Sequence, residues 1–570
     1  MQKIDKVMKK QKNIRTYFLL MAGMLLGFIS CTDLDDNVYS EIVADKYEYK
    51  EGDIVAILGK AYLPFRAPAG YSHELSDWWT DQVCLPQKYW GWGSENDHKH
   101  NFNPEGTGYM QLLPHWNGYY NGISTCNQLL EQIEDGVFSP ENKEEMIAEI
   151  RVIRAAYYYF LCDLWGNVPI VLKFNVEEGY LPEQSTREEV FNFIIKEVTE
   201  SIPLLSIEAN QSTYCRFNKY AAYAILAKMY LNAEVYVGTP MWDKCISACD
   251  SIILSGKFAL TPTQKACFAR NNEVTGLSEA VFAVAFDGKY SKNLSFASLS
   301  LNGQHGDLLY NITGGHCNGG AVMVPQFIST FDEDDARLRN NYVYGLQWQS
   351  NGAPLLAGFG RINGEQMNIE NFVASIKGDG SNCDENMGYR LAKWEYYTEM
   401  DVYAMDNDVF LFRYTDVLMM KAECLLRTEK EDDAAEIVTE VRKRAFPSTP
   451  AKATVTGAIL KQGSSFAYGK KEYKWIGRQK IWEEEADNTH EGGDDIVFGR
   501  FFDELGWEFD QEGHRRQDMI RFKTTAGESV WIAKGWLSHF ATHDKNKELY
   551  PIPATQLDNN KKLTQNPGYN

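Results

Sequence analysis

Residues 146–169 read MIAEIRVIRAAYYYFLCDLWGNVP, and this stretch carries the clearest structural pattern in the chain. Its apolar side chains recur at steps of four and three residues, at Met146, Ile150, Ile153, Tyr157, Phe160 and Leu164. That spacing places them on one face of an α-helix. The pattern therefore predicts an amphipathic helix over about residues 142–165, packed against its neighbours through this stripe.

The same periodicity predicts further helices on both sides of this one. They cover residues 116–130, 186–205, 218–237, 240–256, 411–425 and 434–445. Ser185 or Thr186 is expected to cap one of them, because a hydroxyl there accepts a hydrogen bond from a free N–H of the first turn. Amphipathic helices joined by short links predict antiparallel pairs that stack as in tetratricopeptide repeats. The expected fold is mainly α.

Residues 257–405 break the helical pattern. Glycine, asparagine and serine become frequent there, and a short run at Ala280–Phe286 is typical of a strand. Aromatic and apolar residues continue throughout, so we expect a large loop-rich excursion of one domain and not a linker. The helical scaffold is then expected over about 50–256 and 406–446, completed by a C-terminal segment at 476–570.

The first thirty residues are typical of an export signal. Basic residues precede the apolar run Tyr17–Ile29, which is too short to span a bilayer as a helix. Ser30 then precedes Cys31, an arrangement that resembles the lipobox of bacterial lipoproteins. We expect residues 1–30 to be removed and Cys31 to carry lipid at the start of a single domain covering 31–570. An ordinary signal peptide with an incidental cysteine is the alternative.

Charge and cysteine usage exclude some classes of function. The net charge of −21 opposes binding to phosphate backbones, so nucleic acid is not expected as a partner. Apart from Cys31, the cysteines are scattered without paired spacing. We expect them to pack as small apolar side chains and not to bind a metal, while the sequence leaves any disulfide pairing open.

Short motifs follow one another along nearly the whole chain. They are Asn127–Leu130, Ala148–Arg151, Arg154–Tyr158, Leu164–Pro169, Ala227–Leu231, Arg413–Leu418, Lys421–Glu423, Glu512–Arg516, Asp518–Arg521, Tyr550–Pro553 and Gln565–Tyr569. In this order, and together with the lipobox, they resemble the SusD/RagB family of outer-membrane nutrient-binding lipoproteins.

The resemblance implies a SusD-like fold, in which four tetratricopeptide-like helix pairs support a loop-rich ligand-binding excursion. It implies a SusC-like TonB-dependent transporter as partner, attachment to the outer membrane through lipid with exposure at the cell surface, and no catalysis. Most motif residues are expected to be structural. Alternating charges are expected to form ion pairs that hold the C-terminal segment on the scaffold, at Glu512, Arg515, Arg516, Asp518 and Arg521.

Segment 77–101 has the side chains that a carbohydrate site needs. An aromatic plane stacks on the C–H face of a sugar, while acid, amide and imidazole groups bind its hydroxyls. The candidate ligand-binding residues here are Trp78, Trp79, Tyr89, Trp90, Trp92, Asp97 and His98. Tyr310 and His316 form a second candidate wall, in a region that the resembled family uses for ligands. Alternatively, two or three of these tryptophans anchor the loop to the scaffold.

Three functions fit this sequence. Glycan capture for import is preferred over peptide capture, the alternative offered by the RagB branch, because an extended peptide needs an open strand edge or apolar pockets. A surface polysaccharide hydrolase would need two opposed carboxylates, and no such pair stands out. No cofactor or metal is expected, although Asp406, Asn407 and Asp408 are oxygen ligands of the kind that a structural Ca²⁺ uses.

Overall fold

The computed structural model describes residues 50–66, 75–87, 95–106, 112–290, 295–374, 376, 383–476, 479–484 and 489–569. Lys50–Asn570 forms one compact unit. The predicted signal segment and Cys31 lie outside the described residues, as do Tyr89, Trp90 and Trp92.

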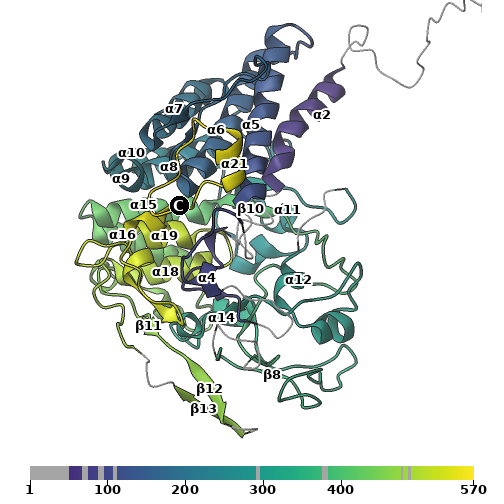
Figure 1. Ribbon diagram of the computed structural model, residues 1–570, viewed down its shortest axis with the longest axis vertical. Helices are drawn as coiled ribbons and strands as arrows, with labels where there is room; N and C mark the ends of the chain where they lie inside the picture. The colour runs from purple at the N-terminus through teal and green to yellow at the C-terminus, as the bar shows by residue number, and fades with distance from the viewer. Residues whose placement is uncertain are drawn as a thin grey trace, which may run out of the picture. The chain divides into compact units, whose positions relative to one another are not determined.

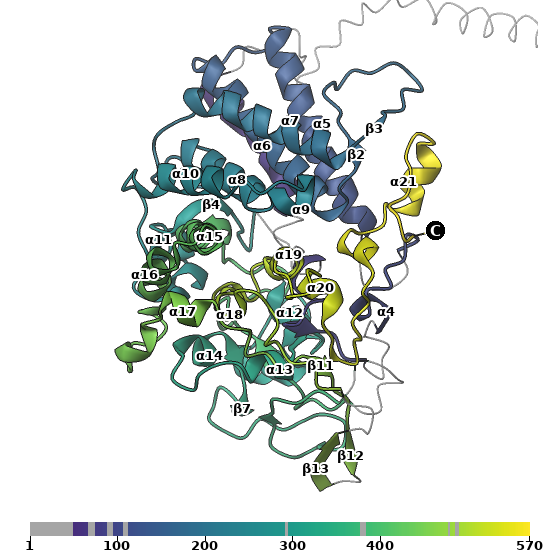
Figure 2. The ribbon, with the colours of Figure 1, turned by 90° about the vertical axis from the view of Figure 1, so that its left-hand side faces the viewer.

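Long helices form a continuous stack (Figures 1 and 2). They are α2 (Glu51–Tyr62), α5 (Leu112–Glu134), α6 (Lys143–Leu164), α7 (Arg187–Ser201), α8 (Lys219–Leu231), α9 (Ala233–Val237), α10 (Trp242–Ile253), α15 (Tyr414–Arg427) and α16 (Glu431–Arg442). From α5 onward each long helix packs against the next, with the short α9 set beside α7 and α8. The prediction of a mainly α fold built from stacked helix pairs is confirmed.

Helix α6 is more deeply buried than its amphipathic pattern predicts. Tyr158 and Tyr159, which lie off the predicted stripe, are buried as well. Neighbours enclose α6 on several sides, because it contacts α2, α5, α7 and α8. A buried helix must also neutralise its charged residues. Arg154 therefore pairs with Glu197 of α7 at 2.5 Å and donates a hydrogen bond to Asn127 of α5 at 2.8 Å.

One helix begins at the cap residue that the sequence predicts, and two others begin two or three residues later than predicted. Thr186 caps α7 as expected: its hydroxyl accepts from the Glu189 N–H at 3.2 Å, and the Glu189 carboxylate accepts from the Thr186 N–H at 2.8 Å. The helix predicted from residue 240 begins at Trp242. The helix predicted from Leu411 begins at Tyr414, because residues 409–413 form a strand.

The loop-rich excursion is inserted between two adjacent helices of the stack, since α10 and α15 pack together although the excursion separates them in sequence. Strand β4 (Ala280–Val284) pairs antiparallel with β10 (Val409–Arg413) and closes its base. The predicted strand at 280–286 is thus confirmed over its first five residues. The other described elements of the excursion are η4 (Gln264–Phe268), α11 (Asn272–Thr275), α12 (Phe296–Ser300), η5 (His305–Tyr310), β5 (Val322–Met323), α13 (Pro325–Ile328), α14 (Ala336–Asn340), β6 (Tyr342–Val343), β7 (Gly345–Leu346), β8 (Asn368–Ile369) and β9 (Arg390–Leu391).

The short strands of the excursion tie it together. Antiparallel pairs join β6 to β9, β7 to β8, and β5 to β1 (Val83–Cys84). Near the scaffold, β2 (Val168–Pro169) pairs with β3 (Gln184–Ser185), and α4 (Glu95–His98) precedes α5. These pairings bring segments that are far apart in sequence into contact.

Residues 447–570, which include the predicted C-terminal segment 476–570, follow the last scaffold helix α16 in the sequence. Their elements are α17 (Gly457–Leu460), β11 (Gly469–Lys470), β12 (Tyr473–Ile476), β13 (Gln479–Glu484), α18 (Gly499–Phe509), α19 (Arg515–Arg521), α20 (Val530–Ala533), β14 (Trp536–Leu537), η7 (Lys545–Glu548) and α21 (Ala554–Asn559). Strands β12 and β13 form an antiparallel hairpin that projects from the rest of this unit (Figure 1).

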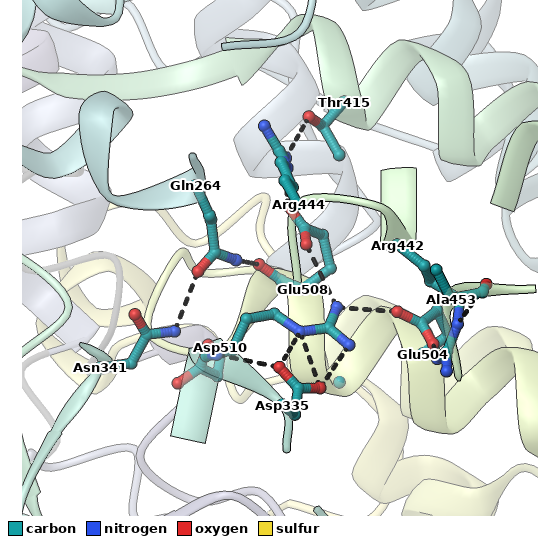
Figure 3. Close-up of polar contacts among 12 residues, drawn as sticks. Gln264, Asp335, Asn341, Thr415, Arg442, Arg444, Ala453, Glu504, Glu508 and Asp510 are labelled. Carbon is teal, nitrogen blue, oxygen red and sulfur yellow. Dashed lines mark hydrogen bonds and ion pairs between the residues drawn. The ribbon is translucent and has the colours of Figure 1, made fainter. Parts of the chain in front are cut away.

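Helix α18 brings two buried carboxylates to the junction of the three parts (Figure 3). Glu504 pairs with Arg337 of the excursion at 2.7 Å and with Arg442 of the scaffold. Glu508 accepts from Arg413 at 3.0 Å and from Arg444 at 2.6 Å. Burial alone would raise the pKa of Glu508, but the surrounding guanidinium groups hold it below its ordinary value. The two carboxylates therefore stay charged and link all three parts.

The charged motif after α18 has the structural role that its sequence predicts. Arg515 pairs with Asp81, Arg516 with Asp163 at the end of α6, and Arg521 with Glu423 of α15, at 2.7, 2.9 and 2.7 Å. Glu512 accepts from Lys393 and Arg413, each at 2.6 Å, and Asp518 accepts from Arg521 at 2.6 Å. The prediction that these side chains hold the C-terminal segment in place is confirmed.

Candidate ligand-binding site

Trp78 and Trp79 are buried, with exposed fractions of 7% and 1%. The prediction that these two rings are presented to solvent is wrong. Their polar neighbours suggested exposure, but those neighbours bond inside the protein. Asp77 accepts from the Gly513 N–H at 2.7 Å, and Asp81 accepts from the guanidinium of Arg515. The aspartates thus fix this segment under the C-terminal motif, and the alternative of anchoring tryptophans holds for both rings.

Asp97 and His98 are also buried, so the structure does not present them to solvent as the predicted sugar-binding rim would require. Both lie in α4, whose His98 ring contacts Trp536 and His539 with ring centroids 5.8 and 6.1 Å apart. Burial lowers the pKa of His98 well below its ordinary value, and the neighbouring His539 adds to the effect. His98 is therefore a neutral side chain of the core.

Several exposed aromatic and apolar side chains lie on the excursion. Trp348, Tyr403 and Leu308 are exposed by 49%, 46% and 42%. Tyr310 is half-buried, and His316 is exposed. We call these five residues the aromatic surface. Tyr310 and His316, the second predicted wall, are thus at least partly accessible, and whether they contact a ligand stays a prediction.

Backbone hydrogen bonds hold the three segments of the aromatic surface side by side. The Ser350 N–H donates to the carbonyl of Leu308 at 2.9 Å, which joins the segment of Trp348 to η5. On the other side, the Glu399 N–H donates to the carbonyl of Tyr310 at 2.8 Å, and the Val402 N–H to that of Thr313 at 3.0 Å. The segment 308–316 therefore lies between the segments that carry Trp348 and Tyr403.

The backbone of the aromatic surface has unusual geometry. Element η5 is a π-helical turn. Such turns are rare in proteins overall, and those that occur are often found at functional sites. Asn311 and Glu399, which flank the contact between two of the segments, have φ angles of 48° and 63°. Non-glycine residues seldom adopt such angles, and those that do cluster at binding sites. A Cβ on Gly315 would lie 2.5 Å from the Tyr403 ring, so the close approach of that ring requires glycine.

A buried polar contact fixes the residue that precedes Trp348. His305 of η5 and Gln347, the residue before Trp348, approach at 3.2 Å through Nε2 and Oε1. The Gln347 amide also donates to the carbonyls of Tyr344 and Gly345, at 2.9 and 2.8 Å. Burial lowers the pKa of His305 to about 4, so the imidazole is neutral at ordinary pH. The segment of Trp348 is thereby fixed to η5.

Sequence reasoning missed Leu308, Trp348 and Tyr403. Trp348 lies four residues before Gly352, and the stretch 346–349 alternates apolar and polar side chains before the turn Ser350–Gly352. An aromatic residue on a short alternating strand beside a turn was the available signal. Tyr403 carries no comparable local signal, because its position depends on the distant Gly315.

The segment 406–408 uses its side chains within the protein. Asp406 pairs with Arg270 at 2.6 Å, and Asp408 accepts from the Tyr214 hydroxyl at 2.6 Å. Within the described ranges, no group of three or more His, Cys, Asp or Glu side chains could hold a metal ion. No disulfide joins the cysteines of the described ranges, and all of these cysteines except Cys215 are buried.

Among the helices that the structure describes, none is both long and apolar enough to cross a membrane.

Two family models match the chain. Residues 278–569 match the SusD family, and residues 45–231 match the family described as "Starch-binding associating with outer membrane". The chain is similar to the starch-binding protein SusD of Bacteroides thetaiotaomicron, with 25% identity over 481 residues that cover 78% of this chain and 76% of that protein. A SusD-like protein of Bacteroides ovatus is 32% identical over 121 residues, covering 20% and 21% of the two chains.

Solved structures share the fold. A SusD superfamily protein from Parabacteroides distasonis matches with a TM-score of 0.66 at 18% identity, over 92% of this chain and all of that one. A laminarin-binding SusD-like protein matches with a TM-score of 0.63 at 17% identity, over 92% of this chain and 100% of that one. With a family model that covers half of its length, the chain belongs to the SusD family.

Proposed function

We propose that this chain captures oligo- or polysaccharide at the cell surface and delivers it unaltered to a SusC-like TonB-dependent transporter of the outer membrane. The observation that carries the proposal is the aromatic surface, with Trp348 and Tyr403 exposed on two segments that are each hydrogen-bonded to the segment 308–316 between them. Such rings lose little conformational entropy on binding and stack on the C–H face of a sugar. Asp307, Asn311 and His316 are exposed on or directly before the segment 308–316. Their side chains offer hydrogen-bonding groups for sugar hydroxyls.

Printed descriptions of relatives support a glycan as the ligand. One relative is a starch-binding protein, and one structural neighbour is a laminarin-binding protein. Starch and laminarin are both glucose polymers, so rings that stack on sugar faces would serve either. Peptide capture, the alternative, becomes an outcome of the binding test below.

Carboxyl groups whose pKa is raised, as acid catalysis requires, already bond to other groups of the protein, which supports binding without hydrolysis. A general acid needs a raised pKa and access to the scissile bond. Burial raises the pKa of Asp416 and of Asp503, but Asp416 pairs with Lys228, and Asp503 accepts from Ser464 and Ser465. Burial likewise raises the pKa of Glu385, whose carboxylate accepts from the N–H groups of Gly358 and Phe359. These groups are committed to the protein.

Affinity electrophoresis against a panel of polysaccharides tests the capture, with release of reducing ends measured in parallel. We expect retardation on at least one glucan without release. Trp348→Ala should abolish the retardation, while Phe540→Ala should keep it, because Phe540 is equally exposed but lies outside the aromatic surface. Retardation that persists in Trp348→Ala would place the site elsewhere. Release of reducing ends that survives purification would make the protein a hydrolase, and binding of peptides alone would favour the alternative ligand.

Attachment and delivery are tested separately. Cys31→Ala is expected to move the protein from the membrane fraction to the soluble fraction, because lipid on Cys31 is the proposed tether. Affinity purification of the chain from solubilised outer membranes is expected to recover a TonB-dependent transporter. A Cys31→Ala protein that stays in the membrane fraction would refute the lipid anchor, and purification without any transporter would refute the partnership.

A further inference from the structure

A cavity of about 320 Å³ opens between the first helix of the stack and strand β4. None of the five residues of the aromatic surface lines it. Its floor is aromatic and aliphatic, formed by Phe65, Phe282 and Val284, which are nearly fully buried. Its size lies within the range of small-molecule sites in proteins, which are mostly apolar with few polar groups.

The floor of the cavity is preformed. Phe65 stacks on Tyr157 of α6 with ring centroids 4.2 Å apart, and Phe282 stacks on Phe217 at 4.0 Å. Tyr62, which also lines the cavity, is held by its hydroxyl, which donates to Glu149 and accepts from the Phe217 N–H. A ligand would therefore meet ordered rings, and binding would not require the cavity to form first.

Among the described residues that line the cavity, the charged side chains are two cations, although the protein carries a net charge of −21. They are Lys60 of α2 and Arg66 just beyond it. Neither forms an ion pair or hydrogen bond with any residue in the described part of the chain, and no acidic residue there lines the cavity. The nearby Glu149 is already paired with Arg216 at 2.6 Å.

Arg66 is partly buried, and burial lowers its pKa, with no acidic side chain among the described residues to offset the effect. A partly buried cation without a counterion is unfavourable unless something else supplies the negative charge. An apolar floor beside the partly buried Arg66 and the exposed Lys60, neither paired with an acid of the described residues, matches a ligand that has an apolar body and one anionic group.

We propose that this α2–β4 cavity binds a small amphipathic anion, a carboxylate or sulfonate attached to an aliphatic or aromatic body. The apolar body lies against Phe282 and Val284, and the anionic group pairs with Arg66 and Lys60. This site is separate from the glycan site and does not depend on it.

Helix α2 supplies a matched pair of variants. A Cβ on Gly59, which lines the cavity, would meet no atom within 4 Å, so Gly59→Trp introduces a bulky ring at the cavity from a position where its Cβ is unhindered. A Cβ on Gly52 of the same helix is equally free, but Gly52 does not line the cavity. Both changes replace a helical glycine and should raise helix stability rather than lower it. Gly52→Trp is therefore the control.

The test uses the purified full chain and the fluorescent probe anilinonaphthalene sulfonate, displaced by octanoate. We expect octanoate to displace the probe at least tenfold more strongly than octylammonium, which has the same tail and the opposite charge, a difference of ~1.4 kcal/mol. Gly59→Trp should weaken the binding of the probe and of octanoate by about tenfold or more, and Gly52→Trp should weaken it by less than about twofold. Equal displacement by the two amphiphiles, or unchanged binding in Gly59→Trp, would overturn the proposal.

Arg66→Gln gives an independent result should Gly59→Trp disturb the fold. It keeps the cavity and removes one cation, so binding of octanoate should weaken several-fold while binding of neutral octanol stays unchanged. Loss of both ligands, or of neither, would contradict the assigned role of Arg66. Retardation by polysaccharide should be unaffected in all three variants, which separates this outcome from the proposed glycan function.

Discussion

The guanidinium of Arg515 donates two hydrogen bonds to the carboxylate of Asp81, at 2.7 and 2.8 Å, across a sequence separation of 434 residues. Both side chains are buried. The pair joins the first part of the domain to the C-terminal segment and explains why Trp78 and Trp79, which lie just before Asp81, are enclosed. The same carboxylate also accepts from the Tyr468 hydroxyl at 2.5 Å.

Removing one partner of this pair should be strongly destabilising. Arg515→Gln leaves the Asp81 carboxylate buried without its cation, and such a loss typically lowers the free energy of unfolding by about 3–5 kcal/mol. Chemical denaturation, followed by tryptophan fluorescence, measures the change. The control is Lys443→Gln, which breaks an exposed pair with Glu440 and should cost less than about 1 kcal/mol. Equal effects of the two substitutions would contradict a structural role for Arg515.

The helical stack could be predicted from the sequence because its signals are local. The apolar periodicity of 146–164 and the hydroxyl of Thr186 act within one or two helical turns, and the structure follows them. Leu411 shows the limit of this reasoning. Its neighbourhood continues a helical pattern, but pairing with β4 extends residues 409–413 as a strand. Local periodicity cannot report a partner that lies far away in the sequence.

The candidate site was harder to predict for the same physical reason. Asp77 and Asp81 made the segment of Trp78 look solvent-exposed, yet their partners, Gly513 and Arg515, are more than four hundred residues away. Tyr310 and His316 could be proposed from the family resemblance. The approach of Tyr403 to Gly315 depends on tertiary contact, so neither local sequence predicts it.

Trp348 and Trp79 should respond in opposite ways to substitution by alanine. Trp348→Ala removes an exposed ring, so we expect glycan binding to weaken by about 1–3 kcal/mol with little change in Tm. Trp79→Ala opens a cavity in the core and should lower the free energy of unfolding by about 3–5 kcal/mol. Isothermal titration with a bound glucan and thermal denaturation separate the two effects. A folded Trp79→Ala protein of normal stability with lost affinity would reverse the assignment.

Gly315 should matter for binding through the position of Tyr403. In Gly315→Ala the new Cβ would lie 2.5 Å from the Tyr403 ring, so the ring must move. We expect glycan affinity to fall by about 1 kcal/mol, because Tyr403 no longer shares one surface with Trp348. Gly303→Ala is the matched control, since its Cβ would make an ordinary contact of 3.7 Å. Equal affinity of the two variants would show that Tyr403 does not contact the ligand.

His539 should make stability depend on pH. Burial lowers its pKa to about 3, against about 6.5 in an unfolded chain, so the folded protein binds fewer protons than the unfolded one between these values. The free energy of unfolding therefore falls as pH is lowered from about 6.5 towards 3, by at most about 1.4 kcal/mol per pH unit from this residue. The neighbouring His98 and His100 have pKa values lowered by the same burial and act in the same direction.

His539→Gln removes one of these proton-linked groups, so its free energy of unfolding should decline less steeply than that of the wild type between pH 6.5 and 4.5. Denaturant titrations at several pH values measure the two slopes. His490→Gln makes the same substitution at an exposed position and is the control for the change of side chain itself. A His539→Gln curve with the wild-type slope would mean that His539 is protonated in the folded protein, which its enclosure between His100 and Trp536 makes unfavourable.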